Sequence, residues 1–166
     1  MKAIILAEND FEDLELFYPY YRLMEEGIKV EVASTQREIT GKRGYTLKPD
    51  MNYKDVNPRD YDILVIPGGK SPERVRLNKD ALAIVKHFFE EDKPVAIICH
   101  GVQVLISAGV VKGKKITCWY GVKDDLIAAG GEFIDAVTVD GNIVSARNPG
   151  DLAEWMRKLL SILQKS

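Results

Sequence analysis

The sequence predicts an α/β domain organised around a mostly parallel, doubly wound sheet with one or two antiparallel hairpins. Residues 63–66 and 95–98 are short, unbroken apolar runs, which is the pattern of parallel strands buried on both faces. Segments with helical periodicity separate the predicted strands along the chain. That alternation is typical of βαβ units, in which helices cover the faces of a parallel sheet.

The chain opens with one such βαβ unit. Residues 2–6 form an apolar strand, and residues 29–33 alternate charged and apolar side chains, as a partly exposed strand would. Between these strands, apolar side chains recur at helical spacing at Leu14, Phe17, Tyr18, Tyr21 and Met24. Gly27 suits the position just after this helix, and Pro19 predicts a kink or a restart within it.

The remaining elements follow from the same patterns. Residues 38–48 contain two glycines but lack the Walker pattern, so they fit a β-hairpin turn better than a phosphate-binding loop. An Asp-Gly turn predicts a second hairpin over residues 137–145. Residues 116–119 resemble a short strand, and helices are predicted over residues 82–91, 102–108 and 123–129. The last helix has the clearest apolar stripe, at Leu152, Trp155, Met156, Leu159, Leu160 and Leu163.

Composition narrows the possible function classes. The net charge of −2 gives no basic field for nucleic acid or an anionic membrane, and no apolar run approaches the ~18 residues of a membrane span. The N-terminal apolar run is too short for a signal segment, so we expect a cytoplasmic protein. In that reducing compartment Cys99 and Cys118 are not expected to form a disulfide. Metal-ligand spacings are absent, and we expect neither a metal nor a cofactor.

The stretch with the clearest chemistry is residues 95–101. Its predicted strand runs directly into Cys99-His100-Gly101, and a helical segment follows. A cysteine at such a turn is lifted out of the sheet and lies near a helix N-terminus, where peptide dipoles favour the thiolate. The alternative is an inert core thiol, because cysteine is often buried, and Cys118 is expected to be of this structural kind.

Three predicted strand ends carry residues that could meet at one edge of the sheet. They are Glu12, Gly68-Gly69 with Glu73, and Cys99-His100. Each acid could equally stabilise the first turn of the helix that follows it. His100 is adjacent to the cysteine in sequence but would need a carboxylate to orient it as a base.

Six motifs in order resemble the PfpI-type intracellular peptidase family of the ThiJ/PfpI superfamily. They are Phe11-Glu12-Asp13, Pro67-Gly68-Gly69, Pro72-Glu73-Arg74-Val75-Arg76, Ile98-Cys99-His100-Gly101, Leu105-Ile106-Ser107-Ala108-Gly109-Val110 and Asn148-Pro149-Gly150-Asp151-Leu152. The resemblance covers essentially the whole chain. It implies a single PfpI-like domain (class I glutamine amidotransferase-like) over residues 1–166, folded as a flavodoxin-like three-layer αβα sandwich with a nucleophile elbow.

The resemblance also implies residue roles. Cys99 would be the nucleophile and His100 its base, with the N–H groups of Gly69 and His100 forming an oxyanion hole. Glu12 would be a protonated acid bonded to the cysteine sulfur. Glu73 would orient the histidine of a neighbouring subunit, so the site would form only in an oligomer, a dimer or more often a hexamer.

The chain departs from the family pattern in three places. Val102 replaces the usual proline after Cys-His-Gly, and Asn148 stands where many relatives have a second histidine. Trp119-Tyr120-Gly121 replaces Tyr-Pro-Gly, which makes Trp119 and Tyr120 candidate substrate-pocket residues. These changes bear on the shape of the pocket more than on the nucleophile.

The expected activity is that of a cysteine-dependent hydrolase acting on peptide or glycated-amine carbonyls, as a thiol protease or a deglycase. A glyoxalase acting on methylglyoxal is an alternative. A non-enzymatic alternative is a stress-response chaperone that senses redox state through oxidation of Cys99. The same thiol would serve all of these functions, so the sequence leaves the choice open. We expect a peptide or small carbonyl substrate, and neither nucleic acid nor membrane as partner.

Overall fold

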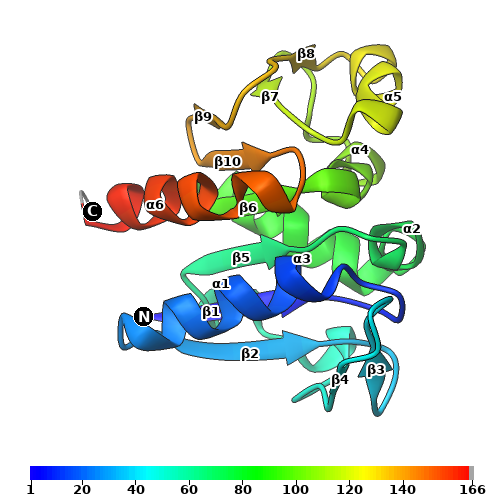
Figure 1. The fold of residues 1–166 in the computed structure, drawn as a ribbon, viewed down its shortest axis with the longest axis vertical. Helices are drawn as coiled ribbons and strands as arrows, with labels where there is room; N and C mark the ends of the chain where they lie inside the picture. The colour runs from blue at the N-terminus through cyan, green and yellow to red at the C-terminus, as the bar shows by residue number, and fades with distance from the viewer. Residues whose placement is uncertain (165–166) are drawn as a thin grey trace.

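The computed structural model describes residues 1–164 and has a six-stranded sheet at its centre (Figure 1). The strand order is β2–β1–β5–β6–β10–β9. The parallel strands are β1 (Lys2–Leu6), β2 (Lys29–Ala33), β5 (Ile63–Ile66), β6 (Val95–Ile98) and β10 (Ile143–Ala146). The edge strand β9 (Thr138–Asp140) is antiparallel to β10. The mostly parallel sheet predicted from the sequence is therefore confirmed.

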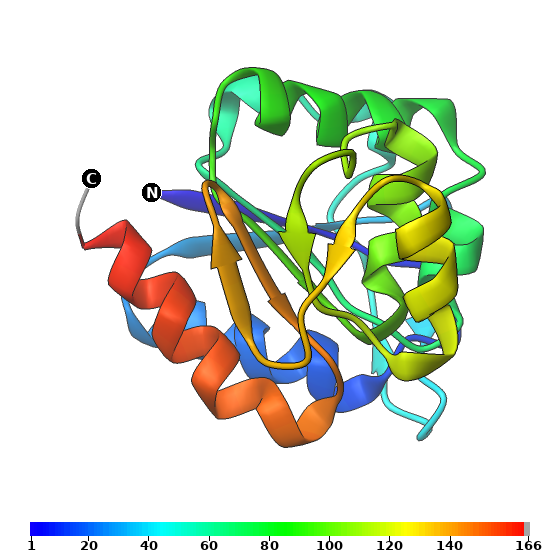
Figure 2. The ribbon, with the colours of Figure 1, turned by 90° about the horizontal axis from the view of Figure 1, so that it is seen from above.

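Helices cover both faces of the sheet, as the view from above shows (Figure 2). On one face lie α1 (Asp13–Glu25) and α6 (Leu152–Leu163), and on the other lie α3 (Lys79–Glu90) and α4 (Val102–Ala108). The shorter helices α2 (Ser71–Val75) and α5 (Lys123–Ala128) contact α4. This is the flavodoxin-like three-layer arrangement expected. Within residues 1–164, no helix is both long and apolar enough to cross a membrane.

The central strands divide their side chains between two hydrophobic clusters, one under each layer of helices. In β6, Val95 and Ile97 face α3 and α4, whereas Ala96 and Ile98 face α1 and α6. Every residue of β5 and β6 is buried. Since side chains alternate across a strand, burial on both faces explains why these strands are unbroken apolar runs in the sequence.

Both predicted hairpins form. The first pairs β3 (Ile39–Thr40) with β4 (Thr46–Leu47), and its turn is held by α1, because the Asp13 carboxylate accepts hydrogen bonds from the N–H groups of Arg43 (2.9 Å) and Tyr45 (3.1 Å). A Cβ on Gly41 would lie 2.4 Å from that carboxylate. The second hairpin joins β9 to β10 through Gly141, whose φ is +58°.

The predicted strand over residues 116–119 is shorter than expected. Strand β7 (Lys115–Ile116) ends early and pairs in parallel with β8 (Glu132–Phe133). The Thr117 N–H then donates to the Ser145 hydroxyl at 2.9 Å, and the chain turns into the 3-10 segment Tyr120–Val122. Trp119 therefore directly precedes this 3-10 segment, and Tyr120 is its first residue.

Helix α1 differs from its prediction in two ways. It continues through Pro19 without a restart. The apolar side chains whose spacing predicts the helix lie largely outside the core, with Leu14 57% and Tyr21 61% exposed. The buried side of the helix instead carries Asp13, Glu15, Leu16, Pro19 and Leu23.

Replacing the Trp155 side chain tests how α6 packs against the sheet. It is fully buried, and its indole N–H donates to the carbonyl oxygen of Val144 at 3.1 Å. We expect Trp155→Ala to lower the free energy of unfolding by about 3–5 kcal/mol, because it leaves a large cavity. Urea unfolding measures this loss, with Leu77→Ala as a control, because Leu77 is 83% exposed. A loss below about 1 kcal/mol for Trp155→Ala would contradict the packing described.

Candidate active site

Cys99 lies at a sharp turn where β6 gives way to the 3-10 segment Cys99–Gly101 and then to α4. Its φ is +61°, in the left-handed region that residues other than glycine rarely adopt. A Cβ on Gly101 would lie 2.8 Å from the carbonyl oxygen of Ile66, so the turn needs glycine there to pass close to β5. The half-buried thiol is therefore held at the carboxyl edge of the sheet, in the geometry of a nucleophile elbow.

The glycine pair after β5 brings backbone close to this thiol. A Cβ on Gly68 would lie 2.6 Å from the Cβ of Cys99, and one on Gly69 would lie 2.5 Å from the backbone of residues 10 and 12. The N–H groups of Gly69 and His100 both form hydrogen bonds to the Cys99 sulfur. These are the two donors that the family resemblance implies for an oxyanion hole, and both lie beside the reacting sulfur.

His100 lies against the thiol. Its Nδ1 is 3.2 Å from the Cys99 sulfur. Burial lowers the pKa of the imidazole, the charge of Lys42 lowers it further, and the charge of Glu73 acts in the opposite direction. A neutral imidazole results, which can accept the thiol proton.

The acid beside the thiol is Glu15, which corrects the expectation that Glu12 would bond the sulfur. Glu12 immediately precedes α1, and its carboxylate pairs with Lys42 at 2.8 Å and lies 3.9 Å from Arg43. Glu15 lies one turn further into the helix, fully buried, and accepts the N–H of Gly68 at 2.9 Å. The backbone direction at the start of α1 thus turns Glu12 towards the hairpin and Glu15 towards the thiol.

Burial dominates the ionisation of this pair. It raises the pKa of Glu15 to about 8, so the carboxyl group is protonated at neutral pH. Its Oε2 atom is buried without a hydrogen-bond partner among the described residues, and protonated it would be a free donor. Burial, followed by the charge of Glu15, raises the pKa of the Cys99 thiol to about 12 against the opposing effects of Gly69 and His100. These effects act against the thiolate that the sequence predicts at the helix start and favour the protonated thiol.

The other predicted residues occupy different parts of the site. Glu73 is exposed on α2, and its carboxylate has no hydrogen bond or ion pair within the described chain. The main-chain N–H of Trp119 donates to the carbonyl oxygen of Cys99 at 3.1 Å, which places the Trp119-Tyr120 segment beside the elbow. Cys118 is fully buried, as expected of a structural thiol. Among residues 1–164, no group of three or more His, Cys, Asp or Glu side chains could hold a metal ion.

Sequence reasoning missed Glu15 and Lys42. The available signal for Glu15 is its place on the same buried helix stripe as Leu16, Pro19 and Leu23, since a charged residue on such a stripe needs a partner or a function. Lys42 gives no comparable signal. It reaches the site because the hairpin turn is fixed on Asp13, which the sequence does not reveal.

The buried Glu15 carboxyl group should make stability depend on pH. Its pKa is raised from 4.5 to about 8, so unfolding releases a proton between these pH values and stability falls as the pH rises through this window. We expect Glu15→Gln to match the native protein near pH 4 and to exceed its free energy of unfolding at pH 9, by up to roughly 5 kcal/mol. Urea unfolding across this pH range measures the difference, with Glu90→Gln on the exposed side of α3 as control. Parallel curves for Glu15→Gln and the native protein would contradict a raised pKa.

Residues 1–162 match the DJ-1/PfpI family. The chain is 55% identical over 166 residues to the deglycase PfpI of Pyrococcus furiosus, covering 99% of this chain and 100% of the relative. It is 40% identical to the putative cysteine protease YraA of Bacillus subtilis, covering 98% of each.

A solved structure shares the fold over nearly the whole chain. The two-domain protein from Anabaena variabilis, with DJ-1/ThiJ/PfpI-like and ferritin-like domains, superposes with a TM-score of 0.96 at 35% identity. The match covers 98% of this chain and 48% of that protein, so this chain corresponds to about half of the larger one. Together with the elbow at Cys99, these matches show that the chain belongs to the DJ-1/PfpI family.

Proposed function

We propose that this protein is a cysteine-dependent hydrolase that releases amines from their carbonyl adducts, a deglycase. The observation that carries the proposal is the Cys99 thiol on its elbow, with His100 Nδ1 at 3.2 Å and two backbone N–H groups directed at the sulfur. The name deglycase given to PfpI of Pyrococcus furiosus, 55% identical over its full length, supports the choice of substrate class.

The chemistry follows from the protonation states. His100 is neutral and takes the thiol proton as the sulfur attacks the carbon of the adduct, so thiolate forms only during the reaction. The C–S bond forms, the C–N bond breaks, and His100 returns the proton to the departing amine. Water then attacks the same carbon, so that a C–O bond forms, the C–S bond breaks and a proton of the water returns to the sulfur through His100. The N–H groups of Gly69 and His100 would stabilise negative charge on the substrate oxygen, an effect of about 2.7–4 kcal/mol per donor in other enzymes.

Peptide hydrolysis is the second candidate. The same attack on a peptide carbonyl would make the protein a cysteine peptidase, and YraA of Bacillus subtilis, 40% identical, is named a putative cysteine protease. The half-buried thiol favours a small adduct over a folded polypeptide, because a long chain must reach a sulfur that lies below the surface.

We further propose that the active unit is an oligomer, a dimer or a hexamer, in which Glu73 orients His100 of a neighbouring subunit. The exposed carboxylate has no hydrogen bond within the described chain and is free to contact another one. Its charge also reaches His100 of its own chain and raises the pKa of that imidazole. Glu73 could therefore act on His100 of its own chain or of a neighbouring chain, and one experiment separates these two cases.

Cys99→Ser tests the nucleophile. We expect at least a hundredfold loss of amine release from a methylglyoxal adduct of N-acetyl-lysine, because serine is a far weaker nucleophile next to the same base. Cys118→Ser is the matched control and should retain activity. Parallel assays with free methylglyoxal and with a fluorogenic peptide separate deglycase, glyoxalase and peptidase activity. Retention of all activities by Cys99→Ser would refute the nucleophile assignment.

Mixing variants tests the role of Glu73. Glu73→Gln should lower kcat about tenfold or more while thermal stability is unchanged, since the exposed carboxylate stabilises no fold contact. If Glu73 acts between subunits, mixing Glu73→Gln with Cys99→Ser should restore part of the activity once subunits exchange. In the control mixture, the Cys99→Ser/Glu73→Gln double variant takes the place of Cys99→Ser, so that no subunit supplies an intact Glu73. Exchange shown by mass labelling without any recovery would refute action between subunits.

A further inference from the structure

Two aromatic residues stand beside the elbow with their rings partly in solvent. Trp119 is 38% and Tyr120 50% exposed, and their ring centroids are 5.8 Å apart. Exposed aromatic rings at this position could form an apolar wall for a substrate. The backbone at one end of the wall is anchored to the elbow, because the main-chain N–H of Trp119 donates to the carbonyl oxygen of Cys99 at 3.1 Å.

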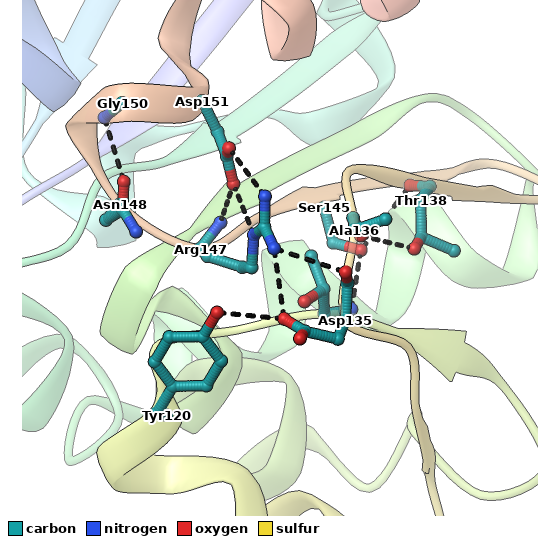
Figure 3. Close-up of polar contacts among 10 residues, drawn as sticks. Tyr120, Asp135, Ala136, Thr138, Ser145, Arg147, Asn148, Gly150 and Asp151 are labelled. Atoms are coloured by element: carbon teal, nitrogen blue, oxygen red, sulfur yellow. Dashed lines mark hydrogen bonds and ion pairs between the residues drawn. The ribbon is translucent and has the colours of Figure 1, made fainter.

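The other end of the wall is held by its phenol. The Tyr120 hydroxyl donates to Asp135 Oδ1 at 2.9 Å, and Arg147 donates to the same oxygen at 3.0 Å (Figure 3). Arg147 also donates to the main-chain oxygen of Asp135 at 3.1 Å. Asp135 is thereby fixed through both its backbone and its side chain, and it presents a localised acceptor to Tyr120.

Arg147 is itself rigidly attached. Its Nε and its second terminal nitrogen donate to the two carboxylate oxygens of Asp151 at 2.9 and 3.0 Å, and its backbone N–H donates to Asp151 at 2.9 Å. This two-pronged pairing fixes orientation as well as distance. Arg147 directly follows Ala146, which pairs with Ile98 in β6, so it lies one strand away from Cys99.

The charge of Arg147 is occupied by these partners. Its hydrogen bonds lower the pKa of both Asp135 and Asp151, which therefore remain carboxylates. Two carboxylates around one guanidinium leave little attraction for an anionic substrate. Arg147 therefore holds Asp135 and Asp151 in place and does not serve as an anion-binding group.

We propose that Arg147, Asp135 and Tyr120 are positioning residues that hold the Trp119-Tyr120 wall against the elbow and give the site a preference for carbonyl substrates with a flat aromatic or apolar group. This proposal rests on the proposed function and deepens it by naming the substrate class. The residues act through the wall and do not touch the reacting carbon.

Substrate preference provides the first readout. Tyr120→Phe and Asp135→Asn should raise KM three- to tenfold for a phenylglyoxal adduct of N-acetyl-lysine, with kcat within twofold. The KM for the corresponding methylglyoxal adduct should change by less than twofold. Tyr21→Phe, which removes a hydroxyl from the exposed side of α1, should leave both values unchanged. Equal changes for the two adducts, or none, would overturn the proposal.

Alkylation of Cys99 provides a second readout that needs no turnover. The rate ratio of 2-iodo-N-phenylacetamide to iodoacetamide, followed by mass spectrometry of the Cys99 peptide, measures how well the wall receives an aromatic group. The ratio should fall at least threefold in Tyr120→Phe and in Asp135→Asn. Combining the two substitutions should lower it no further, because both remove the same hydrogen bond between Tyr120 and Asp135. An unchanged ratio in folded variants overturns the proposal. A lowered ratio in a protein without hydrolase activity would uphold the wall and refute the proposed function.

Discussion

The left-handed backbone at Cys99 is the constraint on which the rest of the site depends. A non-glycine residue in that conformation costs of order 1–3 kcal/mol, and it persists because the surrounding structure leaves it no alternative. Strand β6 is buried on both faces, and α4 begins almost at once. The turn between them fits only because Gly68 and Gly101 lack side chains at the points of closest approach. The packing of the sheet therefore fixes the position of one sulfur atom.

Burial favours the neutral forms of the three ionisable groups around the reacting sulfur. Glu15 and Cys99 share a buried space in which neither charge is well solvated, and His100 is neutral for the same reason. The charge of Lys42, which reaches the site from the β3–β4 hairpin and pairs with Glu12, lowers the pKa of all three groups. A protonated thiol reacts more slowly with oxidants than a thiolate does.

Much of the fold could be predicted from the sequence because its signals are local. Burial can be predicted directly from the apolar runs at residues 63–66 and 95–98 and from the apolar stripe of α6. The elbow could be predicted because Cys99 and His100 adjoin such a run. Glu15 could not, since the more apolar side of α1 is the one left exposed and the buried side carries an acid. The link from Tyr120 through Asp135 to Arg147 joins three separate segments, and no periodicity encodes it.

The glycine-containing turn of the β3–β4 hairpin is tied to α1 in an unusual way. Its N–H groups bind a carboxylate as a phosphate-binding loop would bind its ligand, but the carboxylate is the chain's own Asp13. Surface hairpins are normally the parts of a protein where insertions and loop exchange are best tolerated. Here the hydrogen bonds to Asp13 constrain the length of the loop. Asp13 lies two positions before Glu15, the acid beside the thiol. A loop transplanted from a relative would therefore need its own helix start with it, and the two segments should diversify as one module.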